Sequence, residues 1–181
     1  MKKFELTNEF ITNMFGTKLF RIRALVEFGD VEAGELGGYV EKESNLGHDD
    51  NAWVYDNAWV YGNARVYGDA QVSGDALVYG NARVCSDALV CGNARVCSDE
   101  DYAYAHGFGS VNRTTTFFRL KDGGVGVRCG CFYGTLAQFR DKIRETHGET
   151  KKAQEYLMLA DLMELRFEED ENEVGNRKYV E

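Results

Sequence analysis

Arginine and tyrosine are the side chains of this chain best suited to recognise a ligand. They recur at multiples of six residues: Arg65 and Arg83 are 18 apart, as are Tyr61 and Tyr79, and Tyr67 follows Tyr61 by six. Aromatic rings stack on flat groups and guanidinium groups contact anions, so together they could bind a flat, anionic, nucleotide-like molecule. The full predicted ligand-binding set is Arg65, Arg83, Arg95, Tyr61, Tyr67, Tyr79, His106 and Arg113.

These residues are carried by, or follow, a six-residue repeat that runs eight times without a gap over residues 51–98. Its pattern is [Asn/Asp]-Ala-x-Val-x-[Gly/Ser/Asp], with no exception in the Ala column (Ala52 to Ala94) or the Val column (Val54 to Val96). Residues two apart point to one side of a strand, and Gly, Asn and Asp favour turns. The repeat therefore predicts one short strand per hexad, because a period of six does not fit a helix and a hairpin meander needs longer strands.

This pattern resembles the hexapeptide-repeat, left-handed parallel β-helix, whose triangular coils carry one hexad per side and hence ~18 residues each. Residues 39–50 fit two degenerate hexads, with Val40 and Leu46 in the Ala column and His48 in the Val column. The expected fold is mainly β, with a short left-handed β-helix of about three coils.

The flanking segments must cover the two ends of so short a prism, because open strand edges promote aggregation. Residues 18–28 alternate as a capping strand, and residues 114–121 and 125–132 flank a hairpin turn at Asp122-Gly123-Gly124. Thr135 and Gln138 form a capping box for a helix that ends near His147-Gly148, and a second helix should span about 151–167. The predicted boundaries are an N-terminal cap (1–38), the β-helix (39–101), a C-terminal α+β appendage (102–167) and an acidic, solvated tail (168–181).

If positions 18 apart stack, the outward residues form three faces. Face one carries Trp53, Gln71 and Leu89, face two Trp59, Leu77 and Arg95, and face three Arg65 and Arg83. Soluble monomers seldom expose Trp beside Leu, and proteins that resemble this family are commonly homotrimers packed through prism faces. The predicted oligomer interface is Trp53, Trp59, Leu77 and Leu89; the alternative is that the terminal segments cover these faces.

Charge and cysteine content bound the possible partners. With 21 basic and 30 acidic residues the net charge is −9, which argues against general nucleic-acid binding and against anionic membranes. The chain shows neither an apolar signal segment nor a run of ~18 apolar residues. Five cysteines, three of them six residues apart, predict reduced thiols and a cytoplasmic protein.

Hexapeptide proteins are often acyltransferases that use a His as general base. Of the three histidines, His106 is the best candidate for this general base, but no acidic residue lies at a sequence spacing that would indicate a partner for it. No phosphate loop, metalloprotease motif or nucleophile elbow is present, and Cys129-Gly130-Cys131 lacks the second pair that a zinc site needs. We therefore predict no catalytic residue, no metal and no cofactor, with acyl transfer as the enzymatic alternative.

The flanks Gly34–Val40 and Cys129–Thr135, with Thr146-His147-Gly148, resemble those of small phage and prophage proteins with a β-helix core. The resemblance implies a non-enzymatic, homo-oligomeric binder in the host cytosol that counters antiviral defence by sequestering a small nucleotide signal. An inhibitor or adaptor that acts through protein contact stays open. Mimicry of DNA is disfavoured, because residues 51–98 hold four acids against three bases.

Overall fold

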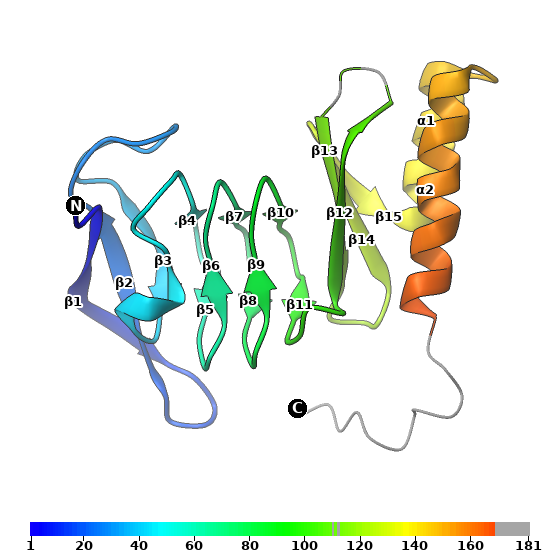
Figure 1. The fold of residues 1–181 in the computed structure, drawn as a ribbon. Helices are drawn as coiled ribbons and strands as arrows, with labels where there is room; N and C mark the ends of the chain where they lie inside the picture. The colour runs from blue at the N-terminus through cyan, green and yellow to red at the C-terminus, as the bar shows by residue number, and fades with distance from the viewer. Residues whose placement is uncertain (110, 112, 169–181) are drawn as a thin grey trace.

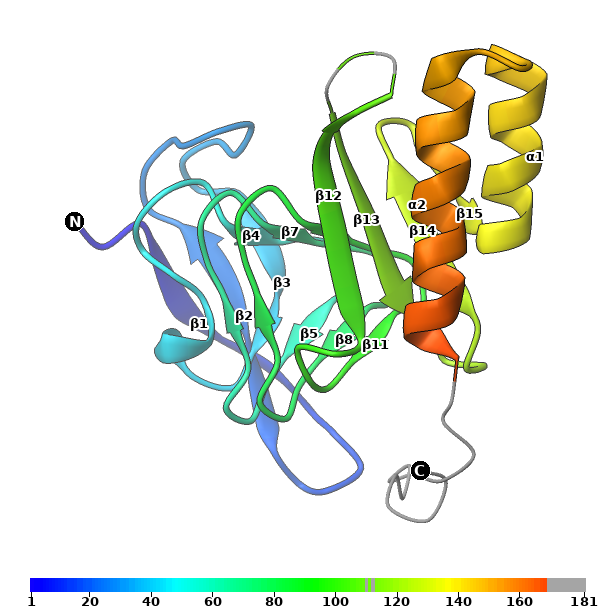
Figure 2. The same cartoon turned by 45° about the vertical axis from the view of Figure 1, so that its right-hand side comes forward.

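The computed structural model describes residues 1–109, 111 and 113–168, arranged as a β-solenoid between two caps (Figure 1 and Figure 2). The N-terminal cap contains β1 (Phe4–Thr12), β2 (Lys18–Ala24) and β3 (Leu36–Val40), followed by the 3-10 turn η1 (Glu43–Asn45). The C-terminal part contains β12 (Tyr102–Phe108), β13 (Arg113–Arg119), β14 (Val125–Cys129), β15 (Phe132–Thr135), α1 (Leu136–His147) and α2 (Lys151–Phe167). Between them lie eight two-residue strands: β4 (Trp53–Val54), β5 (Trp59–Val60), β6 (Arg65–Val66), β7 (Gln71–Val72), β8 (Leu77–Val78), β9 (Arg83–Val84), β10 (Leu89–Val90) and β11 (Arg95–Val96).

The eight short strands stack in parallel with an offset of 18 residues. On face one Trp53 pairs with Gln71 and Gln71 with Leu89; on face two Trp59 pairs with Leu77 and Leu77 with Arg95. Arg65 pairs with Arg83 on face three. Every Ala and Val of the two columns is fully buried, so the interior is filled by small and β-branched side chains. The predicted solenoid of about three turns and its three faces are confirmed.

The first coil departs from the predicted alignment. Val40 pairs with Val60, and Leu46 bridges Val66, so both are 20 residues from their partners rather than 18. The placement of Val40 and Leu46 in the Ala column is therefore wrong, as is that of His48 in the Val column. Six residues separate Leu46 from Ala52 where four separate Val66 from Ala70, so the corner at residues 47–51 is two residues longer.

The hydrogen bonds between coils alternate in direction, as in any parallel ladder, and those made at the Ala column run from each coil to the next. Each outward residue donates its N–H to an Ala carbonyl of the following coil, as from Trp53 to Ala70 (3.1 Å) and from Trp59 to Ala76 (2.9 Å). The Ala carbonyls of the first coil therefore have no donor within the solenoid, and the outward N–H groups of the last coil have no acceptor within it. Buried backbone groups of this kind must find other partners.

Hydrogen-bond donors cap the Ala carbonyls of the first coil, and each of the three faces uses a different donor. The Ala52 carbonyl accepts from the ammonium of Lys3 (2.8 Å) and the Ala64 carbonyl from the side-chain amide of Asn45 (2.8 Å). On face two the backbone N–H of Tyr39 in β3 donates to Ala58 (2.9 Å), and β2 and β1 extend the same sheet. Lys3 also donates to the carbonyls of Asp49 and Asp50 in the long corner (3.4 and 3.1 Å).

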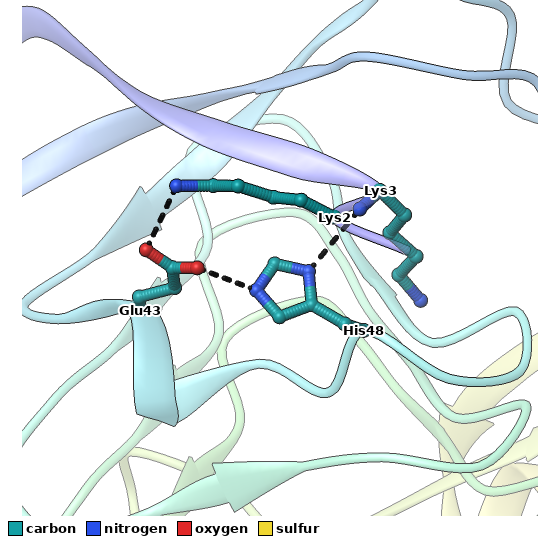
Figure 3. A network of polar contacts seen from close by, with 4 residues as sticks. All are labelled: Lys2, Lys3, Glu43 and His48. Atoms are coloured by element: carbon teal, nitrogen blue, oxygen red, sulfur yellow. Dashed lines mark hydrogen bonds and ion pairs between the residues drawn. The ribbon is translucent and has the colours of Figure 1, made fainter.

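A polar network holds the start of β1 beside this corner (Figure 3). The N–H of Lys3 donates to Nδ1 of His48 (3.3 Å), which leaves Nε2 to donate to Glu43 (2.8 Å). Glu43 also pairs with Lys2 (3.0 Å), and Phe4 stacks on the imidazole with ring centroids 4.3 Å apart. His48 therefore has a structural role.

Acceptors cap the N–H end. The N–H of Arg83 donates to the carboxylate of Asp99 (2.7 Å) and that of Leu89 to the hydroxyl of Thr116 (2.9 Å). Asp101, which is buried, accepts from the N–H groups of Cys97 and Ser98 (2.9 Å each). Phe118, Leu120 and Tyr102 close the core at this end.

The four-stranded sheet β12-β13-β14-β15 packs one face against α1 and α2, as Figure 2 shows. The side chains between them form a core separate from that of the solenoid. The capping box of Thr135 and Gln138 and both helices are as predicted. The predicted strand at residues 18–28 ends at Ala24, and β1, β12 and β15 were not predicted. No described helix is long and apolar enough to cross a membrane. Apart from Glu168, the predicted tail lies outside the described residues.

The solenoid interior should reject added volume. Ala76 is fully buried in the Ala column, whereas Leu77 beside it points outward and is partly exposed. We expect Ala76→Leu to lower the free energy of unfolding by about 1–3 kcal/mol, because overpacking forces side chains out of their rotamers. Leu77→Ala is the matched control and should cost less in urea denaturation; an Ala76→Leu variant as stable as the parent would contradict a packed interior.

The ammonium of Lys3 should stabilise the carbonyl end of the prism. We expect Lys3→Met to lower the free energy of unfolding by about 1–3 kcal/mol, because it leaves the Ala52 carbonyl without its donor. Lys2→Met removes only an exposed ion pair and should cost less than about 1 kcal/mol. Equal losses for the two neighbouring lysines in chemical denaturation would show that Lys3 is not a cap.

The Lys3 cap should also depend on pH. Burial lowers the pKa of Lys3 from 10.5 to about 8, against the opposing effect of Asp50 and Asp49. The folded chain thus releases this proton before the unfolded chain does, so the wild type should gain stability relative to Lys3→Met as the pH rises from about 8 to 10.5. The neutral amine still donates two hydrogen bonds. A stability difference that shrinks over this range would contradict the shift.

Candidate functional site

A groove of about 450 Å³ lies over face one of the solenoid, within the range of small-molecule sites. Its floor is formed by outward residues of the second and third coils, and its sides by the two caps. The lining residues are Gly29, Asp30, Asn51, Tyr55, Asp69, Gln71, Asp87, Leu89, His106, Arg113, Thr114 and Gly130.

The groove exists because both caps extend beyond the prism on the same side. In Figure 1 the loop that precedes β3 rises on one side of the solenoid corners, and the adjoining ends of β12 and β13 rise on the other. Phe28 of the N-terminal loop packs edge-on against Trp53 (centroids 5.3 Å apart), which covers the first coil. The second and third coils stay uncovered between the two walls, so Gln71 and Leu89 form the floor.

One edge of the groove is a polar column along a corner of the solenoid. Asn51, Asp69 and Asp87 follow one another at intervals of 18 residues, and Asn51 donates to Asp69 (2.7 Å). Neighbouring coils are ~4.8 Å apart, so the two carboxylates of this column lie close together. With Asp30 on the N-terminal wall, the groove presents three carboxylates, which accept hydrogen bonds from hydroxyl and amino groups.

The opposite wall carries His106 and Arg113. Nδ1 of His106 lies 2.9 Å from the hydroxyl of Thr114 and 3.9 Å from a carboxylate oxygen of Asp87. The sequence spacing indicates no acidic partner for His106; in the structure the β12–β13 hairpin folds back along the third coil and brings Asp87 near it. The guanidinium of Arg113 lies against Gly130, where an added methyl group would collide with it.

The groove offers an aromatic ring as well as Leu89. Tyr55 lines the groove, and its burial raises the pKa of its phenol, helped by the negative charges of Asp30 and Glu35. This phenol therefore stays protonated at neutral pH and can donate a hydrogen bond while its ring packs on a flat group.

The structure divides the predicted ligand-binding residues among separate regions. His106 and Arg113 line the groove, whereas Arg65 and Arg83 stand in register on face three, both exposed. Tyr67 lies at the corner between face three and face one and is 38% exposed.

Two carboxylates of the groove, Asp69 and Asp87, were not among the predicted residues. Their spacing of 18 residues, equal to one coil, was the signal that could have found them.

A second group lies at the corner between faces two and three. Tyr61 and Tyr79 stack with centroids 5.3 Å apart and planes 8° from parallel, and burial raises the pKa of Tyr79 to about 12. Arg95 donates to the backbone carbonyls of Asp75 and Ala94 (3.0 and 2.8 Å). Its guanidinium is thus engaged with the backbone.

One residue of the predicted oligomer interface is excluded from it. Trp53 is fully buried beneath Phe4 and Phe28, so the N-terminal segment covers this part of face one, and the assignment of Trp53 to an interface is wrong. Leu89 is partly exposed on the floor of the groove, and Trp59 and Leu77 are partly exposed on face two. A role of these three residues in assembly stays a prediction.

The donor sets of the described residues offer little to a metal ion. No group of three or more His, Cys, Asp or Glu side chains within the described ranges is arranged to hold one. Cys85, Cys91, Cys97, Cys129 and Cys131 are not joined in disulfides, and burial raises the pKa of Cys91. A raised pKa makes this thiol a poor nucleophile.

Comparison with known proteins identifies the repeat and nothing beyond it. The family model described as the YdcK beta solenoid repeat matches residues 58–74 and again residues 70–86. The chain therefore contains β-solenoid repeats of the YdcK type, in the part where the Ala and Val columns have no exception. No curated protein matches the chain.

Proposed function

We propose that this protein binds a small molecule in the groove over face one and acts by holding it, without catalysis. The observation that carries the proposal is the convergence of Arg113 and His106 with three carboxylates and the ring of Tyr55 around one hollow. An open, rigid floor with convergent polar groups is typical of a ligand site.

The charges of the groove restrict the ligand. Asp30, Asp69 and Asp87 outnumber the single permanent cation, Arg113, so a ligand with several phosphates would be repelled. A nucleotide with one phosphate suits the groove better. Arg113 and His106 would contact the phosphate, the carboxylates would accept from ribose hydroxyl or base amino groups, and Tyr55 and Leu89 would pack on the base.

The biological role belongs to the same proposal. A cytoplasmic, self-associating protein that retains a nucleotide signal would lower its free concentration, and for a phage protein that would blunt a host defence. Support for this role comes from the resemblance of the flanking segments to phage proteins and from the nucleotide-compatible groove.

Acyl transfer is a second candidate, because one observation favours it. Thr114 and Asp87 both approach Nδ1 of His106, an arrangement that would orient the ring and direct Nε2 into the groove as a general base. The enzyme would consume acetyl-coenzyme A in the presence of an amine or hydroxyl acceptor, and His106→Gln would abolish turnover. A binding protein would show no turnover with either chain.

Calorimetric titration with cyclic and linear nucleoside monophosphates tests the binding proposal. We expect Arg113→Gln to weaken binding at least about tenfold, because it removes a charge-assisted contact to the phosphate. Arg65→Gln, a matched arginine on face three, should leave the affinity unchanged.

The reverse result, with Arg65→Gln weakening binding and Arg113→Gln silent, would move the site to face three and overturn the groove assignment. Failure of the folded protein to bind any member of the panel would overturn the nucleotide as ligand.

A further inference from the structure

The groove over face one carries its polar groups in a fixed order along the solenoid axis. Asp69 and Gln71 belong to the second coil. Asp87 and Leu89 occupy the equivalent positions of the third coil, where Leu89 pairs with Gln71. Arg113 follows on the wall formed by the C-terminal part. Neighbouring coils are ~4.8 Å apart, so a nucleotide with its phosphate on Arg113 would extend its sugar over the third coil and its base over the second.

The second coil offers this base a hydrogen-bond donor beside an acceptor. Asp69 and Gln71 are separated by Ala70, which is fully buried in the interior. Gln71 is partly exposed, and its side-chain amide forms no hydrogen bond with a described residue. Asp69 accepts from Asn51 at Oδ1 (2.7 Å). A carboxylate has about four acceptor positions, so Asp69 can accept further bonds.

This pair of side chains matches guanine better than the other bases. Guanine presents the acceptor O6 beside two donors, N1–H and the 2-amino group. O6 can accept from the amide of Gln71 while both donors bind the carboxylate of Asp69 in charge-assisted hydrogen bonds. Adenine and cytosine each present an amino group beside a ring nitrogen whose lone pair would face the carboxylate. Uracil presents a single N–H between two carbonyl groups.

We propose that the groove is selective for guanine nucleotides and that Asp69 and Gln71 are the residues that recognise the base. This selectivity rests on the proposed function, because Arg113 must hold the phosphate for the base to lie over the second coil. Asp87 then accepts from the ribose hydroxyl groups over the third coil, and the ring of Tyr55 packs on the face of the base.

Calorimetric titration with the 5′-monophosphates of guanosine (GMP), inosine (IMP) and adenosine (AMP) tests the selectivity. GMP should bind at least about tenfold more tightly than AMP, because each hydrogen bond to a charged group contributes a factor of about ten or more. IMP keeps O6 and N1–H but lacks the 2-amino group, so its affinity should lie between the two.

A change of a single side chain should alter which base is preferred. Asp69→Asn should weaken GMP binding at least about tenfold and make xanthosine 5′-monophosphate (XMP) the preferred ligand, because the asparagine amide offers a donor to O2 of xanthine and an acceptor to N1–H. A misfolded variant could not produce this switch. Asp75→Asn is the matched control, since Asp75 is an exposed corner residue of the same coil outside the groove and should leave GMP affinity unchanged.

The possible failures separate this selectivity from the proposed function. AMP that binds as tightly as GMP, with both weakened by Arg113→Gln, would overturn the selectivity and leave the proposed function standing. GMP binding that is insensitive to Asp69→Asn would also overturn it. A folded protein that binds none of these monophosphates would overturn the proposed function, and the selectivity with it.

Discussion

The structure depends on how the two open ends of its parallel hydrogen-bond ladder are satisfied. At the Ala column each outward N–H donates to the following coil, so the Ala carbonyls of the first coil and the outward N–H groups of the last coil find no partner within the solenoid. Each end must be satisfied by chemistry of opposite kind. The ammonium of Lys3, the amide of Asn45 and the backbone of β3 serve the carbonyl end, and Asp99, Asp101 and Thr116 serve the N–H end.

The caps that solve this problem also create the groove. Lys3 and β1 bring the N-terminal segment over the first coil, where Phe28 covers Trp53. At the other end Thr116 binds the N–H of Leu89, which fixes β13 across the prism and brings His106 and Arg113 of the same hairpin beside face one. Only about three coils lie between the caps, so the uncovered part of face one is a hollow with two walls. A longer solenoid would present a flat face instead.

The repeat made most of the fold predictable, because two columns without exception leave one way to bury all the Ala and Val side chains. The alignment of the first coil with the repeat was wrong because of two extra residues at 47–51. The residue types of the repeat pattern gave no sign of this insertion. The site was predicted only in part: His106 and Arg113 were chosen, but the carboxylates that line the groove with them were not. The contact of His106 with Asp87 depends on the path of the β12–β13 hairpin, a tertiary feature without a local signal. The cover over Trp53 depends equally on Phe28, which is distant in the sequence.

A solenoid holds like residues beside one another, and this has an electrostatic consequence for the groove. Asp69 and Asp87 occupy equivalent positions on adjacent coils, and the backbone ladder keeps them from moving apart. Like charges at neighbouring positions repel one another. At the first coil Asn51 takes the equivalent position and donates to Asp69, which relieves part of the repulsion; His106 stands near Asp87 at the other end of the column. Under the proposed function, a ligand that donates hydrogen bonds to both carboxylates would suit this column, which favours a molecule rich in hydroxyl or amino groups.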